Sequence, residues 1–423
     1  MKKFSTVAAD VDNPNWQFFI ERKKPLYQRE NELRSPFMRD YTRILHSFAY
    51  RRLKHKTQVF FNADNDHVCT RIEHVTHVDS VSSTIARALG LNEDLTRAIA
   101  IGHDLGHAPF GHQGEEIIDE LIKEYNKSIG EGADSIDSFW HEKNGLLFVD
   151  EVELLEDSDN FYRNLNLTYA VRDGIISHCG EVNENGIAPR NERIDLYSFK
   201  NAGQYQPYTW EGCVVKISDK IAYLGRDIED AISLGFLDQQ ARSVFLDVMK
   251  KTDQEVINTT NIIYTLINDI CDNSSPSAGI RLSKKSFDLI QSVKHYNEDY
   301  IYKHKRFKAY KNYAHLVIKE IYDFLSDLAP EIDAGHFWNE LKQMEQYYPT
   351  LIKSFELHIS KYCDIAFIPE SCTDLRSNSQ KCLNDKIYGC LDTRKKYISA
   401  IINYISGMTD RFALKLFEEL IHF

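Results

Sequence analysis

The chain has 423 residues, of which 43% are hydrophobic and 27% charged, and its formal net charge is −12. This length suffices for two or three domains with substantial cores, and the acidic balance argues against a dedicated duplex-binding protein, which needs a basic surface. No apolar run reaches the ~18–20 residues that span a bilayer, and the first 16 residues lack the hydrophobic segment of a signal peptide. We therefore expect a cytoplasmic protein without a membrane segment.

Helical periodicity begins early in the chain. Apolar residues recur at three- and four-residue spacing between Val78 and Leu89, and Gly90 follows as a C-terminal stop signal. Asn92 is a suitable cap for a second helix, which is expected to end near His103. The two helices form a predicted pair joined by a short turn.

The rest of the chain also favours helices. Gly106, Pro109 and Gly111 break the chain into a turn, residues 113–125 resume a helix, and residues 126–138 are small and acidic, as in an exposed loop. A strong amphipathic helix is expected over 211–234, and almost everything from residue 238 onward reads as helix. The pattern predicts a mostly α fold in which a second helical half packs on the first.

Residues 103–116, HDLGHAPFGHQGEE, contain three histidines and three carboxylates. Nine of the sixteen histidines lie between His46 and His141, so the clustering is not a matter of composition. Imidazole nitrogens together with carboxylate oxygens can hold a divalent metal and transfer protons at neutral pH. A single histidine is usually structural, but this group predicts a functional site.

Four residues form the predicted metal site. His74 stands at the head of the first helix, His103 and Asp104 at the end of the second, and Asp219 on an otherwise apolar helix. Two nitrogens and two oxygens leave coordination positions open for water and substrate, as in a catalytic site. For Asp219 a salt bridge to Lys220 or Arg226 remains the alternative.

The order of these motifs resembles a known family. The pattern T-R-x-x-H at residues 70–74, H-D-L-G-H-x-P-F-G-H-x-G-E at residues 103–115 and a distal aspartate is similar to the HD-domain metal-dependent phosphohydrolases, in particular to the deoxyguanosinetriphosphate triphosphohydrolases (dNTPases). The segments 39–47, 51–60 and 404–413 also match. The resemblance thus extends from about Arg39 to Ala413 and implies an HD-domain helical core with a C-terminal helical region packed on it.

The resemblance implies roles for individual residues. The metal ligands would be His74, His103, Asp104 and Asp219, and the catalytic residues His112, Glu115, His107 and His141. Phosphate contacts would come from Arg71 and Lys220, and deoxyribose contacts from Gln58, Tyr223 and Asp227. Asp219, Tyr223 and Asp227 are spaced by four residues and therefore share one helical face.

One segment departs from the pattern. Many relatives have F-x-H-N around the second histidine, whereas this chain has Phe139, Trp140, His141 and Glu142. Glu142 matches the W-x-H-E form of the dNTPases that also carry a SAM domain, although no such domain fits here. The role of His141 therefore rests on a weaker match than that of His112.

The implied reaction is hydrolysis of a deoxynucleoside triphosphate, with dGTP as the expected substrate, to the deoxynucleoside and inorganic triphosphate. One divalent ion per site is expected: Mn, Mg, or a transition metal such as Fe, Co, Ni or Zn. The alternatives are an HD phosphohydrolase acting on nucleoside monophosphates or cyclic nucleotides, and a nucleotide-regulated protein that binds single-stranded nucleic acid.

The expected organisation has three parts: an N-terminal arm at residues 1–34, the HD-type core at 35–236, and a helical region for oligomerisation or the substrate pocket at 237–423. The resemblance implies a homo-oligomer, hexameric or built from dimers. It also leaves room for a dNTP activator and for weak binding of single-stranded nucleic acid. The residues do not explain what the segment Ser406–Ala413 does.

Overall fold

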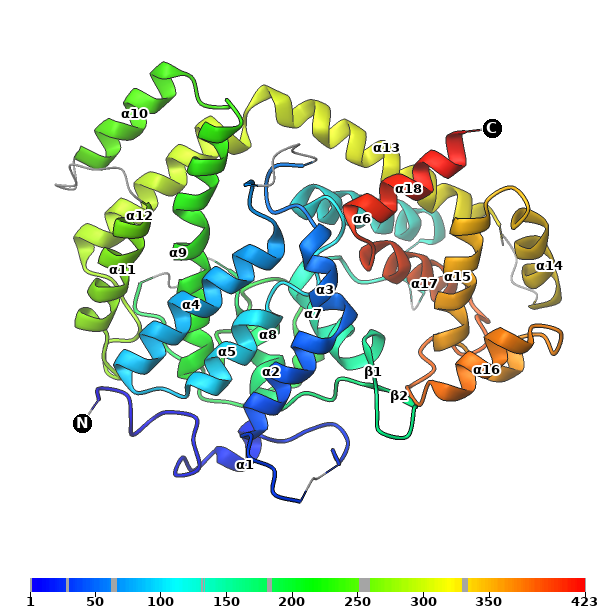
Figure 1. The fold of residues 1–423 in the computed structure, drawn as a ribbon, viewed down its shortest axis with the longest axis horizontal. Coiled ribbons are helices and arrows are strands. Elements are labelled where there is room, and N and C mark those ends of the chain that lie inside the picture. The colour runs from blue at the N-terminus through cyan, green and yellow to red at the C-terminus, as the bar shows by residue number, and fades with distance from the viewer. Residues whose placement is uncertain are drawn as a thin grey trace. The chain divides into compact units, whose positions relative to one another are not determined.

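The computed structural model describes residues 2–27, 30–61, 67–130, 132, 134–180, 185–250, 259–328 and 334–422. Most of these residues are helical, and the strands within the described ranges form one two-stranded sheet (Figure 1). The predicted mostly α fold is confirmed. Among the described helices, none combines the length and apolar character that a bilayer crossing requires.

The chain divides into two compact units, each assembled from three separate stretches. Unit 1 comprises Met1–Leu45, Thr57–Leu105 and Asn166–Tyr310, and unit 2 comprises His46–Lys56, Gly106–Leu165 and Lys311–Phe423. The sequence predicts three continuous segments that meet after residues 34 and 236, and this division stays a prediction.

The helices of unit 1 are α1 (Trp16–Phe19), α2 (Pro36–His46, which ends at the boundary), α4 (Arg71–Leu89), α5 (Glu93–Gly102), α8 (Tyr169–Ser177), a 3-10 turn at Leu196–Ser198, α9 (Trp210–Ser233), α10 (Gln239–Lys250), α11 (Thr259–Asn273), α12 (Lys284–Asn297), a π turn at Glu298–Tyr302, and the start of α13 (Lys305–Asp327).

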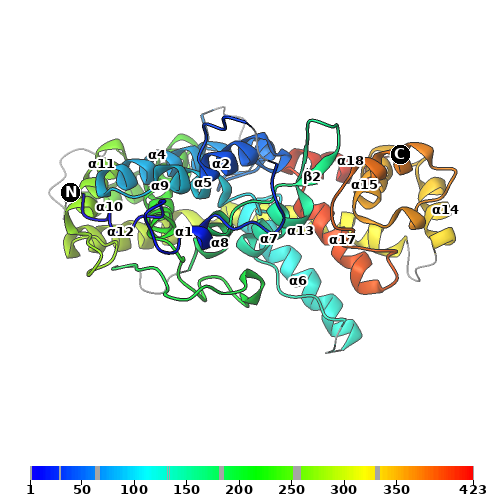
Figure 2. The same cartoon turned by 90° about the horizontal axis from the view of Figure 1, so that it is seen from below.

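Helices α4, α5 and α9 lie side by side at the centre of unit 1 (Figures 1 and 2). The predicted ends of the first two are confirmed, because Gly90 has a φ of 87° after α4 and the Asn92 side chain accepts from the Leu95 N–H at the start of α5. Helix α5 also packs on α8. There a Cβ on Gly174 would lie 2.5 Å from the Ile99 side chain, so only glycine allows this close approach.

The N-terminal arm is tied to this bundle. Phe4 is fully buried and meets the Trp210 ring edge-on at 5.0 Å. One carboxylate oxygen of Glu211 accepts from the backbone N–H groups of Ala9 and Asn92, each at 2.9 Å. A single buried side chain thus joins the arm, the α4–α5 turn and the first turn of α9.

Unit 2 contains α3 (Phe48–Arg52), a 3-10 turn at Leu53–His55, α6 (Gly111–Ile129), α7 (His141–Leu147), a π turn at Phe148–Val152, β1 (Leu154–Glu156), β2 (Tyr162–Asn164), the remainder of α13, α14 (Ala334–Met344), α15 (Pro349–Tyr362), a 3-10 turn at Ile365–Phe367, α16 (Thr373–Lys381), α17 (Arg394–Ser406) and α18 (Asp410–Ile421).

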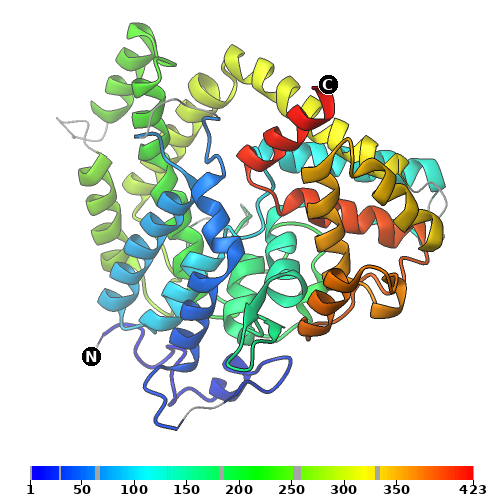
Figure 3. The ribbon, with the colours of Figure 1, turned by 45° about the vertical axis from the view of Figure 1, so that its right-hand side comes forward.

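Helix α15 is the centre of the C-terminal part of unit 2, where it packs against α14, α16, α17 and α18 (Figure 3, orange to red). The fully buried Phe337 meets the ring of Tyr397 edge-on at 5.7 Å. The antiparallel strands β1 and β2 pair Leu155 with Arg163. The two strands are only three residues long, too short for a periodicity that the sequence could reveal.

Helix α6 extends into the segment 126–138 that the sequence predicts as a loop. It continues to Ile129 and ends at Gly130, whose φ is 78°. The Asn126 side chain then exchanges two hydrogen bonds with the backbone of Ile136, at 2.8 and 2.9 Å. The loop therefore folds back on the last turn of the helix, which composition alone does not show.

Because the carboxyl group of Glu211 is buried, we expect the free energy of unfolding to depend on pH. Burial raises its pKa from 4.5 to about 7, since desolvation outweighs the backbone hydrogen bonds. The folded chain therefore holds this proton more tightly than the unfolded chain, and stability falls as the pH rises through this interval, by up to about 1.4 kcal/mol per pH unit. Glu211→Gln removes this titration, so the variant should gain stability relative to wild type between pH 5 and pH 8.

Urea denaturation at the two pH values measures the difference. The exposed Glu156 on β1 provides the control, Glu156→Gln, for which no such gain is expected. A Glu211→Gln stability difference that does not change with pH would contradict the assignment.

Candidate metal centre and histidine cluster

The first turn of α4 presents Arg71 and His74. It begins after Thr70, whose backbone N–H donates to the Glu73 carboxylate at 2.7 Å while its hydroxyl group donates at 3.1 Å. These two bonds to Glu73 fix where the helix starts. Both Arg71 and His74 are buried as a result.

His103 follows α5, and its ring orientation is set by the backbone. Nδ1 lies 2.6 Å from the Ala100 carbonyl oxygen and donates to it, which leaves Nε2 as the ring nitrogen that can bind a metal. Nε2 lies 3.5 Å from an Asp104 oxygen and 3.8 Å from an Asp219 oxygen, and it has no hydrogen-bond partner within the described ranges. A buried ring nitrogen beside two carboxylates is a donor set that a divalent cation can occupy.

Asp219 is supplied by α9. One of its oxygens lies 2.9 Å from His74 Nε2, and the same His74 nitrogen lies 3.9 Å from Asp104. Asp219 contacts His74 directly, and a salt bridge from Asp219 to Lys220 or Arg226 stays an alternative. The four predicted ligands therefore lie together in unit 1.

The charges of this group are coupled. Burial opposes protonation of His74, but the hydrogen bond to Asp219 and the nearby Asp104 outweigh it and raise the His74 pKa. Burial likewise opposes ionisation of Asp219, yet the histidines hold its pKa well below its usual range. Each group thus stabilises the charged form of the other.

The donor set fits a divalent metal. Nitrogen and oxygen donors of His74, His103 and Asp104 lie within 4.8 Å of one another, and so do those of His103, His178 and Asp219. His178 was not anticipated from the sequence. Its Nδ1 lies 2.7 Å from the Ile175 carbonyl oxygen, so its Nε2 is also a lone-pair nitrogen. In the sequence, the only signal for His178 was a histidine directly after an apolar helical segment.

Arg71 lies beside the metal group. It is 1% exposed, and one terminal nitrogen donates to Asp104 at 2.7 Å. Its Nε and its other terminal nitrogen have no hydrogen-bond partner in the described part of the chain. Such buried N–H groups are costly unless an acceptor reaches them, and phosphate oxygens match the planar guanidinium group.

A second polar group on α9 follows Asp219. Burial raises the pKa of Asp227 to about 7, although the Tyr302 hydroxyl donates to this carboxylate. Tyr302, in the π turn after α12, was missed because a tyrosine in an aromatic-rich segment carries no special pattern. Tyr223 and Lys220 are half-buried on the same helix.

Gln58 directly follows Thr57, which forms an isolated bridge with Thr70, the residue before α4. Its carboxamide oxygen is buried and makes no hydrogen bond within the described residues. The structure records no contact of Gln58 with Tyr223 or Asp227, so its deoxyribose role stays a prediction.

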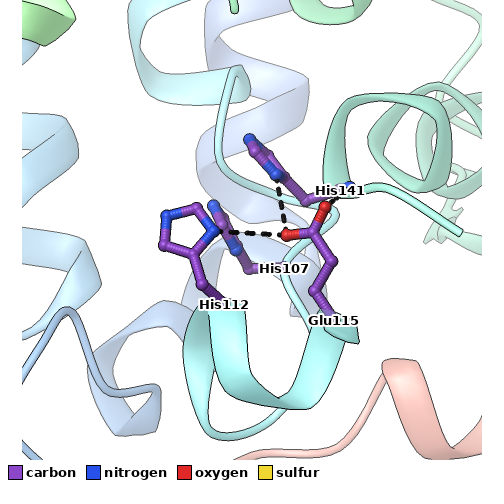
Figure 4. Close-up of side chains that lie close together, drawn as sticks. All are labelled: His107, His112, Glu115 and His141. Carbon is purple, nitrogen blue, oxygen red and sulfur yellow. Dashed lines mark hydrogen bonds and ion pairs between the residues drawn. The ribbon is translucent and has the colours of Figure 1, made fainter. Parts of the chain in front are cut away.

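Unit 2 gathers the other predicted residues, His107, His112, Glu115 and His141, around one carboxylate (Figure 4). One Glu115 oxygen lies 3.3 Å from His112 Nδ1 and 3.1 Å from His141 Nδ1. The other oxygen accepts the His141 backbone N–H at 3.0 Å. The rings of His107 and His141 stack with centroids 3.8 Å apart.

Glu115 is ionised in this setting. Burial favours its neutral form, but His141, His112 and His107 outweigh this and hold its pKa far below the usual range. His141 also lies 3.4 Å from a carboxylate oxygen of the buried Glu142, the residue that departs from the family pattern. The histidine cluster therefore has one shared anion, and the exposed His112 opens it to solvent.

A close backbone approach holds this cluster together. A Cβ on Gly106 would lie 2.0 Å from the His141 carbonyl oxygen and 2.1 Å from the Gly145 nitrogen. Only glycine therefore allows the chain before His107 to pass against the first turn of α7. The structure places every predicted catalytic residue in this one cluster.

From the arrangement of the predicted ligands, we expect substitutions there to change the metal content of the protein. Asp219→Ala removes the oxygen donor that His74 contacts, and we expect loss of the bound divalent ion. His178→Ala should weaken binding by about 10–100-fold, the usual effect of losing a supporting contact. Metal analysis by mass spectrometry and calorimetric titration with Mn²⁺ measure both.

The exposed histidine His295 is the control, and His295→Ala should retain the full metal content. Unchanged Mn²⁺ affinity in Asp219→Ala would refute this metal site.

Comparison with known proteins identifies the family of the chain. Residues 71–224 match the HD domain family. A deoxyguanosinetriphosphate triphosphohydrolase-like protein of Caldanaerobacter subterraneus subsp. tengcongensis is 30% identical over 391 residues, which cover 92% of this chain and 86% of the relative. A protein of the same description from Rickettsia felis is 29% identical over 92% of both chains. The chain therefore belongs to the HD-domain family of deoxyguanosinetriphosphate triphosphohydrolase-like proteins.

Proposed function

We propose that this protein hydrolyses deoxynucleoside triphosphates, with dGTP as the first candidate, to the deoxynucleoside and inorganic triphosphate. Family membership supports phosphohydrolase activity in general. The observation that carries the finer proposal is Arg71, whose buried guanidinium group keeps two nitrogens without hydrogen-bond partners in the described part of the chain, next to the metal group. A phosphate group beside the metal group would accept hydrogen bonds from both of these nitrogens.

In this proposal His74, His103, Asp104 and Asp219 hold one divalent ion, which is Mn, Mg, Fe, Co, Ni or Zn. When bound, such an ion supplies positive charge to the α-phosphate and lowers the pKa of a coordinated water. Arg71 binds a non-bridging phosphate oxygen, and Lys220 adds a second cation from α9. Together they neutralise the charge that builds up on the phosphate in the transition state.

Proton transfer is assigned to the histidine cluster. Glu115 stays ionised between His112 and His141, so it orients both rings and stabilises them when they gain a proton. His112 is the more accessible ring, and its side chain is 67% exposed. His107, stacked on His141, completes the group that accepts and returns the proton.

The sugar is assigned to Asp227 and Tyr223, with Gln58 as a third contact. Asp227 can receive the 3′-hydroxyl group, and Tyr302 fixes the carboxylate that would do so. Tyr223 lies one helical turn before Asp227, where its ring would pack under C2′ and leave no room for a 2′-hydroxyl group. A ribonucleotide would then bring an unpaired and crowded polar group into the site.

Further partners belong to the same proposal. A homo-oligomer, hexameric or built from dimers, a dNTP activator and weak binding of single-stranded nucleic acid follow from the resemblance alone. Their presence would change how the enzyme is regulated rather than which bond is cleaved.

The direct test is to incubate metal-reconstituted protein with each of the four dNTPs and with GTP, and to separate the products by anion exchange. We expect deoxynucleoside and intact triphosphate from at least one dNTP, singly or in a dNTP pair, while GTP is spared. Cleavage of nucleoside monophosphates or cyclic nucleotides instead would identify a different HD phosphohydrolase. Salt-sensitive binding of single strands without any hydrolysis would favour the regulatory alternative.

Tyr223→Ala tests sugar discrimination separately. Removing the ring should lower the ratio of kcat/KM for dGTP over GTP by about 10-fold or more, because the space for a 2′-hydroxyl group opens, while the metal content stays unchanged. The matched control is Tyr264→Ala, which removes an exposed tyrosine of unit 1. An unaltered ratio would remove Tyr223 from the sugar site.

A further inference from the structure

The turn that carries the histidine cluster adopts an unfavourable backbone conformation. Phe110, which is 1% exposed, has a φ of 66°, and Gly111 follows with a φ of 62°. A bulky residue in the left-handed region is rare and persists only where its surroundings enforce it. Since α6 begins at Gly111, this turn sets the direction in which His112 and Glu115 leave the backbone.

One support for this turn comes from the start of α18. The buried backbone N–H of Phe110 donates to a carboxylate oxygen of Asp410 at 2.8 Å, across 300 residues of sequence. Asp410 is itself 6% exposed, and the Thr409 side chain caps its helix by accepting the Phe412 N–H. The acceptor is thus held at a fixed place.

A second support reaches the other end of the turn. Lys56 is 2% exposed, and its ammonium group donates to the His107 carbonyl oxygen and, at 3.1 Å, to the Ser406 carbonyl oxygen. A buried ammonium group is stable only when acceptors surround it. The same cation therefore joins the turn to the end of α17.

The proposed reaction gives no role to the residues of these supports: Lys56 in the motif at 51–60, and Ser406 with Asp410 in the motif at 404–413. We infer that Lys56 and Asp410 are positioning residues that clamp the two ends of the 107–110 turn and thereby set the placement of His107, His112 and Glu115. The inference rests on the proposed function for its effect on catalysis, although the clamp itself can be tested without turnover.

The expected effect is on turnover rather than on substrate binding. A displacement of about 1 Å at a reacting group can cost about 100-fold in rate. Asp410→Ala and Lys56→Met should each lower kcat by about 10–100-fold and alter its pH profile, while KM changes little. Metal content should stay at the wild-type level, because the predicted ligands lie in unit 1.

Two matched controls separate positioning from general damage to unit 2. Glu419, on the same helix α18, accepts the backbone N–H groups of Thr350 and Leu351 at 2.9 and 2.8 Å. Lys386 donates to backbone carbonyl oxygens of Lys361 and Cys382 at 2.9 and 3.2 Å. Glu419→Ala and Lys386→Met remove contacts of the same kind away from the turn, and both should keep the wild-type kcat. Asp410→Asn keeps an acceptor oxygen and should restore most of the activity.

The clamp also has a readout that does not depend on turnover. In protein labelled with ¹³C at the histidine rings, the signals of His107, His112 and His141 should shift in Asp410→Ala and in Lys56→Met, while those of His74 and His103 stay in place. If Asp410→Ala does not fold, Asp410→Glu replaces it, because the longer side chain moves the acceptor and should shift the same signals.

Ring signals that match those of the Glu419→Ala and Lys386→Met controls would overturn the inference. If the wild-type protein releases no triphosphate but the ring signals move as expected, the proposed function fails and the clamp stands. If triphosphate is released and neither the signals nor kcat respond to the substitutions, the clamp fails alone.

Discussion

The arrangement of the predicted metal group in unit 1 depends on His103 Nε2, which faces the carboxylates of Asp104 and Asp219. The Ala100 carbonyl oxygen fixes the orientation of the ring by accepting a hydrogen bond from Nδ1. One ring nitrogen and two carboxylates buried together are unfavourable by themselves, and the arrangement becomes favourable when a cation lies between them. The pairing of α4 with α5 and the packing of α9 on both are what hold these side chains close enough for a metal to join them.

Much of this site could be predicted from the sequence, because its signals are local. The stop at Gly90, the cap at Asn92 and the His103–Asp104 pair each depend on neighbours within a few residues, and the structure confirms the helix ends they predict. His178 and Tyr302 could not be found in this way. Their relevance arises only from contacts with groups more than 40 residues away in the sequence, and their own surroundings in the chain are those of ordinary core residues.

The histidine cluster contains the departure from the family motif, which adds a second carboxylate beside His141. Glu142 replaces the expected asparagine, yet it is buried 3.4 Å from His141, on which Glu115 also converges. His141 is thus placed between two carboxylates, while Glu115 is shared with His112. The sequence could name these residues, but it could not show that a single anion organises them, because that depends on how α6 meets the start of α7.

The interleaving of the two units has a consequence for how the chain acquires its structure. Unit 1 draws on residues up to Tyr310 and unit 2 on residues up to Phe423, and one of their boundaries falls between Leu105 and Gly106, inside the histidine-rich stretch. During synthesis, His107 and His112 would leave the ribosome long before Asp410 exists to receive the Phe110 N–H. Contacts that span 300 residues form slowly, because a long loop must close first. The nascent chain would therefore lack one support of the 107–110 turn until α18 emerges, so the proposed clamp can form only after Asp410 has been synthesised.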